Sequence, residues 1–154
     1  MILNTGLEVI VSSFFGAVVA QWMKFGFNWV KNKKPDFKIL TVTGGMPSSH
    51  SSLAMAITTS TGLILGFRSV EFSIALGFAM VIMYDAAGLR RSAGKMAILL
   101  NRLVEDIYSD KHPKFPHERL IVLLGHTPLE VLMGAMLGAV IAAAIHLIFL
   151  INGL

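Results

Sequence analysis

Two histidines of this chain stand beside residues that could support their chemistry, and His126 is the first of them. It precedes Thr127 and lies four residues before Glu130. At a helix start this spacing lets the carboxylate hold the imidazole by one nitrogen, so that the other nitrogen can act as a nucleophile or transfer a proton. Thr127, Pro128 and Glu130 also have the pattern of a capping box. Catalysis and helix capping are therefore both open for this segment.

His50 is the second histidine, and it follows Ser48 and Ser49 in a segment that opens with Gly44 and Gly45. A helix start presents free backbone N–H groups and the positive end of the helix dipole, so it can hold a phosphate group. The hydroxyls of Ser48 and Ser49 could add donors, and His50 would then lie beside the anion. The alternative is that Ser48 is only an N-cap and His50 a polar residue at the headgroup level.

A third segment carries one acidic and three basic residues, Asp85, Arg90, Arg91 and Lys95. Asp85 lies near the end of an apolar run, where a carboxylate is costly without a partner. The arginine side chains suit phosphoryl oxygens, although they could equally anchor a helix at anionic headgroups. Together the three segments contain what phosphoryl transfer needs: a nucleophile, an acid for the leaving alcohol, and fixed positive charge.

The composition indicates that these segments are carried by membrane-spanning helices. Of 154 residues, 55% are hydrophobic and 14% charged, and the mean hydropathy is +0.70. The chain has no cysteine, which excludes disulfides and thiolate metal sites, and we expect neither a metal nor another cofactor. A net charge of +4 without a nucleic-acid motif favours anionic lipids over nucleic acid as partners.

We expect an all-α membrane bundle of about four transmembrane helices in one domain, residues 1–154, because a span takes about 20 apolar residues. The expected spans are residues 3–30, 49–67, 72–87 and 128–151. The last contains Gly134 and Gly138 at a spacing that permits close helix contact. Residues 89–107 predict an amphipathic helix at the membrane interface, and residues 108–126 a polar cytoplasmic loop.

The basic residues predict which face of the membrane carries the three segments. Of the 13 lysines and arginines, only Arg68 falls on the opposite side of the bundle from the others. Basic loops are retained in the cytoplasm. With four spans, both termini then lie outside the cell, and all three segments lie at the cytoplasmic face.

Three ordered motifs resemble the divergent PAP2 family, which is related to acid phosphatases and vanadium-dependent haloperoxidases. They are Gly-Gly-Met-Pro-Ser-Ser-His-Ser at residues 44–51, Tyr-Asp-Ala-Ala-Gly-Leu-Arg-Arg at 84–91, and Leu-Gly-His-Thr-Pro-Leu-Glu-Val at 124–131. In the wider superfamily a Pro-Ser-Gly-His motif supplies a general acid, and a His-x-x-x-Asp motif supplies the nucleophile with its orienting carboxylate. The resemblance thus implies that His50 is the acid, His126 the nucleophile and Glu130 its orienting group.

The superfamily's cations are not matched in the same way. The arginine expected six residues before the nucleophile is Leu120 here, beside Arg119, and the Lys-x6-Arg-Pro element is not intact. Arg90, Arg91 and Lys95 could substitute for them, with Lys24 and Lys38 as further candidates for the lysine. Because many membrane relatives have more spans, a second copy of the chain could complete the bundle as a homodimer.

The resemblance implies a metal-independent phosphatase that acts on a lipid or polyprenyl phosphate or diphosphate through a phosphohistidine. The alternative is a catalytically silent membrane protein that binds anionic lipid or a protein partner through the same residues. A third hypothesis, a CDP-alcohol transferase, rests on Asp85, Gly88 and Arg91 alone, and it lacks the second acidic pair that would hold two metal ions.

The orientation can be tested by placing single cysteines at Asn32 and Ser109 of this cysteine-free chain. Both positions lie in the segments assigned to the cytoplasm, so both should resist an impermeant thiol reagent applied to intact cells. Ready labelling of either cysteine would contradict the assignment.

Overall fold

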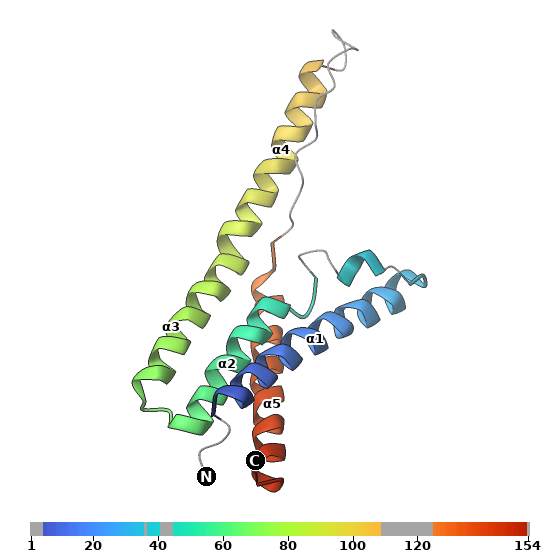
Figure 1. Ribbon diagram of the computed structural model, residues 1–154. Helices are drawn as coiled ribbons and strands as arrows, with labels where there is room; N and C mark the ends of the chain where they lie inside the picture. Colours follow the sequence, from blue (N-terminus) through green and yellow to red (C-terminus); the bar gives the residue numbers. More distant parts are fainter. Residues whose placement is uncertain (1–4, 36, 41–44, 109–124, 154) are drawn as a thin grey trace.

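The computed structural model describes residues 5–35, 37–40, 45–108 and 125–153, and within these ranges the chain is helical, with no strand (Figure 1). The elements in order are α1 (Thr5–Asn32), the 3-10 helix η1 (Phe37–Leu40), α2 (Ser49–Leu65), α3 (Val70–Tyr84), the π-helical turn η2 (Asp85–Leu89), α4 (Arg90–Tyr108) and α5 (Pro128–Ile151). The all-α prediction is confirmed.

Within the described ranges, three helical segments are long and apolar enough to cross a membrane: Gly6–Asn32, Val70–Glu105 and Pro128–Ile151. The second expected span, residues 49–67, corresponds to α2, which has only 17 residues and packs against α1, α3 and α5. Figure 1 places the start of α1 and the end of α5 at the same end of the bundle. A helical membrane bundle is thus confirmed, with a short helix at its centre.

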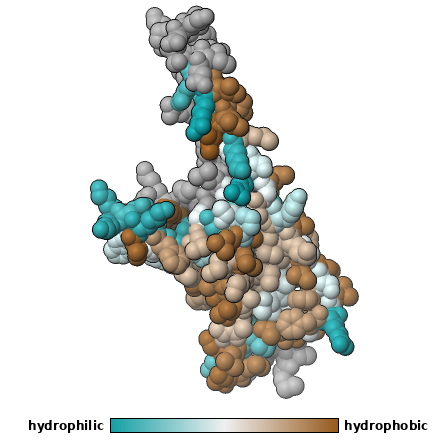
Figure 2. Space-filling model, turned by 180° about the vertical axis from the view of Figure 1, so that it is seen from behind, coloured by the Kyte–Doolittle hydropathy of each residue, from teal (hydrophilic) through white to brown (hydrophobic). Residues whose placement is uncertain are grey.

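The interior of the bundle is built from small side chains, and the large apolar ones face outward. Ala20, Ala56 and Ala142 have no exposed surface, whereas Phe14, Leu132 and Val140 are more than half exposed. Figure 2 shows apolar surface over the bundle, with hydrophilic residues at the C-terminal end of α1 and along α4. This distribution suits helices surrounded by lipid, whose contacts depend on close backbone packing rather than on burial of large side chains.

Gly134 and Gly138 bring α5 against α2 at backbone distance. A Cβ atom at Gly134 would collide with the carbonyl oxygen of Ser48, and one at Gly138 would collide with that of Ser52. On the other side of α2, the Ser52 hydroxyl donates a 2.8 Å hydrogen bond to the carbonyl oxygen of Gly16 in α1. The small-residue spacing that the sequence shows in α5 is therefore the contact surface for α2.

A contact between two ionisable side chains, Glu8 and His146, joins α1 to α5 near the end of the bundle where both termini lie. Glu8 is 4% exposed, and its Oε1 lies 2.8 Å from Nδ1 of His146. An ionisable side chain inside a membrane bundle is stabilised by such pairing. His146 lies in the last two turns of α5, whereas the third sequence motif lies around its first turn.

The predicted amphipathic helix is present as α4, but it is continuous with α3. The sequence bounds place the end of the third span near residue 87 and the start of the amphipathic helix near residue 89, and in the structure the π-helical turn η2 joins the two through Gly88 without a break. In Figure 1, α4 continues the line of α3 and extends beyond the rest of the bundle. Its place at the membrane interface stays a prediction, and most of the predicted loop at 108–126 lies outside the described residues.

Gly138→Leu should lower the stability of the bundle, because the new side chain would push the backbone of α2 away from α5. Overpacking of this kind costs about 1–3 kcal/mol. Gly77→Leu is the matched control, since the Cβ position of Gly77 in α3 meets no atom within 4 Å. Thermal unfolding in detergent should show a lower midpoint for Gly138→Leu alone; equal midpoints for the two variants would contradict this packing.

Candidate functional site at the starts of α2 and α5

The start of α5 is closed by the capping box that the sequence predicts. The Thr127 Oγ1 accepts a 3.3 Å hydrogen bond from the backbone N–H of Glu130, and Glu130 Oε2 accepts a 3.1 Å bond from the backbone N–H of Thr127. Pro128 occupies the first helical turn, where its missing N–H costs nothing. Glu130 therefore has the structural role that the capping hypothesis gives it.

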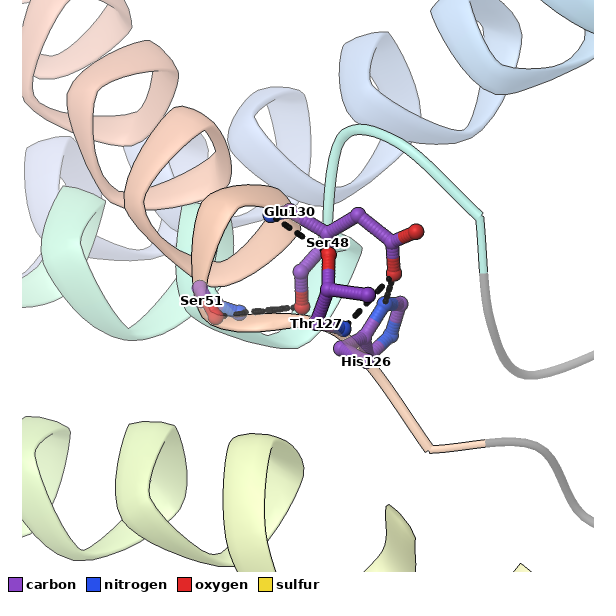
Figure 3. A network of polar contacts seen from close by, with 5 residues as sticks. All are labelled: Ser48, Ser51, His126, Thr127 and Glu130. Carbon is purple, nitrogen blue, oxygen red and sulfur yellow. Dashed lines mark hydrogen bonds and ion pairs between the residues drawn. The ribbon is translucent and has the colours of Figure 1, made fainter.

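The same carboxylate oxygen also holds His126. Figure 3 shows the imidazole beside Glu130, with 3.1 Å between Nδ1 and Oε2. When Glu130 is ionised, its oxygen only accepts hydrogen bonds, so a neutral imidazole held by it carries its proton on Nδ1 and its lone pair on Nε2. Within the described part of the chain, no hydrogen bond engages Nε2. Capping and orienting are thus not exclusive, because one oxygen of Glu130 does both.

Hydrogen bonds hold the backbone of His126 as well as its side chain. Its N–H donates a 3.0 Å hydrogen bond to the carbonyl oxygen of Ala86 in η2, and the residue is only 3% exposed. Asp85 precedes Ala86 and is half-buried at the first position of η2. The second and third sequence motifs are therefore in contact, through backbone atoms.

The first motif joins the same site through Ser48. Its backbone N–H donates a 3.0 Å hydrogen bond to the carbonyl oxygen of Glu130, which fastens the start of α2 to the start of α5. The Ser48 hydroxyl oxygen accepts bonds from the backbone N–H and the hydroxyl of Ser51, at 3.4 and 3.0 Å, and both serines are fully buried (Figure 3). Ser48 thus acts as the N-cap, which is the structural alternative that the sequence left open.

His50 lies in the first turn of α2 with an exposed side chain, and Ser49 before it is half-buried. The two histidines therefore come from the two helix starts that the hydrogen bond between Ser48 and Glu130 holds together. A separation of one phosphoryl group between the imidazoles stays a prediction, and so does phosphate binding by Ser49.

The cations expected from α4 are placed differently. Arg91 and Lys95 have exposed side chains, and neither lines the pocket in which Glu130 lies. The side chain of Arg90 lies outside the described residues. Phosphate binding by these three residues remains a prediction.

The basic residue that the structure places beside Glu130 is Lys24 of α1. It is 3% exposed, and it lines a pocket of about 430 Å³ together with Glu130, Lys31 and Gly45. The charge of Glu130 acts on the Lys24 ammonium, yet no hydrogen bond or direct ion pair reaches that ammonium within the described residues. In the sequence, Lys24 is only a further candidate for the superfamily lysine. The signal that points to it is its position as a lone lysine inside an apolar run. The side chain of Lys38, the other candidate, is not among those described.

The loop before α2 contacts Lys24 at a glycine with a left-handed backbone conformation. Gly45 has a φ of 83°, a conformation that side chains disfavour. A Cβ there would lie 3.4 Å from Cγ and Cδ of Lys24. Gly45 of the first motif thus lies against the lysine stem. No three His, Asp or Glu side chains gather as metal ligands in the described ranges.

Comparison with known proteins places the whole arrangement in a family. Residues 6–141 match the model of the divergent PAP2 family. The chain is 34% identical to the uncharacterized membrane protein YuiD of Bacillus subtilis (strain 168) over 150 residues, which cover 92% of this chain and 95% of that protein. No solved structure gave a significant match. This membrane protein, whose histidine and glutamate share one helix cap, therefore belongs to the divergent PAP2 family.

Proposed function

We propose that the protein is a membrane phosphatase that hydrolyses a lipid or polyprenyl phosphate or diphosphate through a phosphohistidine at His126. The contact between His126 Nδ1 and Glu130 Oε2 is the observation that carries this proposal. It fixes the tautomer in which Nε2 is the nucleophilic nitrogen, and it sets a negative charge beside the imidazolium that forms during attack. A helix cap alone needs only Thr127 and Glu130, so it leaves the histidine unexplained.

In the proposed reaction, Nε2 of His126 attacks phosphorus. A P–N bond forms as the P–O bond to the leaving group breaks, and His50 donates a proton to the departing oxygen. Water then attacks the phosphohistidine: a P–O bond forms as the P–N bond to Nε2 breaks, and His50 accepts a proton from the attacking water. Inorganic phosphate leaves, and the imidazole returns to its starting state with Nδ1 still protonated.

Phosphoryl transfer also needs fixed positive charge around the equatorial oxygens. Lys24 is buried, lines the pocket with Glu130 and feels the charge of that carboxylate, so we assign it the role that the superfamily gives to its lysine. Arg91 and Lys95 could contribute from a second copy in a homodimer. We place the site at the cytoplasmic face because of the basic segments that flank it, with both termini outside.

One observation favours the alternative, a protein that binds anionic lipid or a partner without turnover. His126 is 3% exposed, and substrate must reach Nε2 for catalysis to occur. A silent protein would still need the capping box and would still attract anions to Lys24. Phosphate release is the property that separates the two functions.

Two substitutions can separate capping from catalysis. Glu130→Gln keeps an oxygen that accepts from the Thr127 N–H but removes the charge that stabilises the His126 imidazolium. We expect normal folding and a rate of phosphate release lowered on the order of 10²- to 10⁴-fold, as for loss of the carboxylate in related triads. Thr127→Ala is the matched control: it removes the cap to the Glu130 N–H, costs about 1 kcal/mol of stability, and leaves the carboxylate in place.

The measurement is phosphate release by purified protein from a panel of phosphatidic acid, lysophosphatidic acid and polyprenyl diphosphate, with thermal stability recorded for each variant. The proposal requires Glu130→Gln to be slow and stable, and Thr127→Ala to be less stable but faster than Glu130→Gln. No release from any substrate by the wild-type protein, or equal rates in wild type and Glu130→Gln, would favour the silent alternative.

A further inference from the structure

A buried lysine that feels the charge of Glu130 but makes no hydrogen bond or direct ion pair within the described residues marks one half of a larger binding site. Lys24 is 3% exposed, and its ammonium has no hydrogen bond or ion pair within the described residues. Holding such a charge away from water is costly unless an anion approaches it. Lys31 lines the same pocket, so its two lysines exceed the single charge of Glu130. The pocket is therefore suited to an anionic group.

An apolar groove of about 200 Å³ forms the other half. It lies between α1 and α5 and is lined by Met23 and Phe27 of α1, Met46 of the loop before α2, and Met133 and Met136 of α5. Phe27 and Met46 line the lysine pocket as well. The charged pocket and the apolar groove are thus neighbours that share two side chains.

The groove runs into the membrane-spanning part of α5 and is open at its side. Its lining extends along α5 as far as Val140, which is ten residues beyond Glu130, or about 15 Å of helix. Met23 and Met136 are 38% and 57% exposed on a part of the bundle that lipid would surround. Methionine side chains adapt to flexible apolar ligands, so this lining suits a hydrocarbon chain.

We propose that the pocket and the groove together bind one phosphorylated lipid, with its phosphate at Lys24 and Lys31 and one hydrocarbon chain between α1 and α5. The charge of the pocket selects the anionic headgroup, and the lateral opening lets the chain enter from the bilayer. Placing the phosphate beside Glu130 rests on the proposed function, since this lipid would be its substrate. Binding itself requires no turnover.

The test uses the full chain in nanodiscs that contain a trace of phosphatidic acid with a photoactivatable diazirine in one acyl chain. After irradiation, labelled peptides are mapped and quantified. We expect selective labelling of the stretches around Met23 to Phe27 and Met133 to Val140. The corresponding diacylglycerol probe, which lacks the phosphate, should label these stretches several-fold less.

Two variants and one control sharpen the result. Met136→Trp should block the groove and lower the labelling several-fold. Met80→Trp adds the same bulk at an equally exposed methionine of α3, outside the groove, and should leave the labelling unchanged. Lys24→Gln should lower labelling by phosphatidic acid to the level of the diacylglycerol probe.

The distribution of labelled peptides distinguishes binding in the groove from general contact with bilayer lipid. Labelling spread evenly over α3 and α5, or unaffected by Met136→Trp, would overturn the proposal. Full displacement of the probe by millimolar inorganic phosphate would also overturn it, because the pocket would then bind phosphate without the chain. His126→Ala should be labelled like the wild type. Selective labelling without any phosphate release would refute the catalytic proposal but support this one.

Discussion

The close contact of α2 with α5 is the constraint on which the rest of the molecule depends. At Gly134 and Gly138 the two helices meet at backbone distance, so no side chain fits between them. This approach lets the Ser48 N–H reach the carbonyl oxygen of Glu130. Because the two helix starts are fastened together, motifs that are distant in the sequence can act at one place. The site is therefore a consequence of helix packing as much as of its own side chains.

Glu130 then links this packing to chemistry. One of its oxygens closes the cap of α5 and holds His126, while its charge acts on Lys24 in the neighbouring pocket. The helix cap and the proposed reaction thus draw on the same carboxylate. This sharing explains why a capping interpretation and a catalytic interpretation of the segment are equally consistent with its sequence. It also means that loss of Glu130 alone says little about function unless folding is measured separately.

The sequence predicted the helical membrane bundle, the capping box and the close-packing glycines, because each depends on local spacing or composition. It could not place Lys24 beside Glu130, since the two residues are distant in the chain and only the packing of α1 brings them together. Nor could it show that α3 continues into α4, because a glycine in an apolar run permits both a break and a π-helical turn. Arg91 and Lys95 are candidates by residue type alone, because their side chains suit phosphoryl oxygens. Their location follows from the continuous helix that α3, η2 and α4 form.

Trapping of the covalent intermediate tests the central claim most directly. The wild-type protein would be mixed with ³²P-labelled phosphatidic acid, quenched in alkali, where phosphohistidine is stable, and digested for peptide mapping. The account predicts label on the peptide that contains His126, lost on brief acid treatment and absent from His126→Ala. Release of phosphate at the wild-type rate by His126→Ala, or label on another residue, would contradict it.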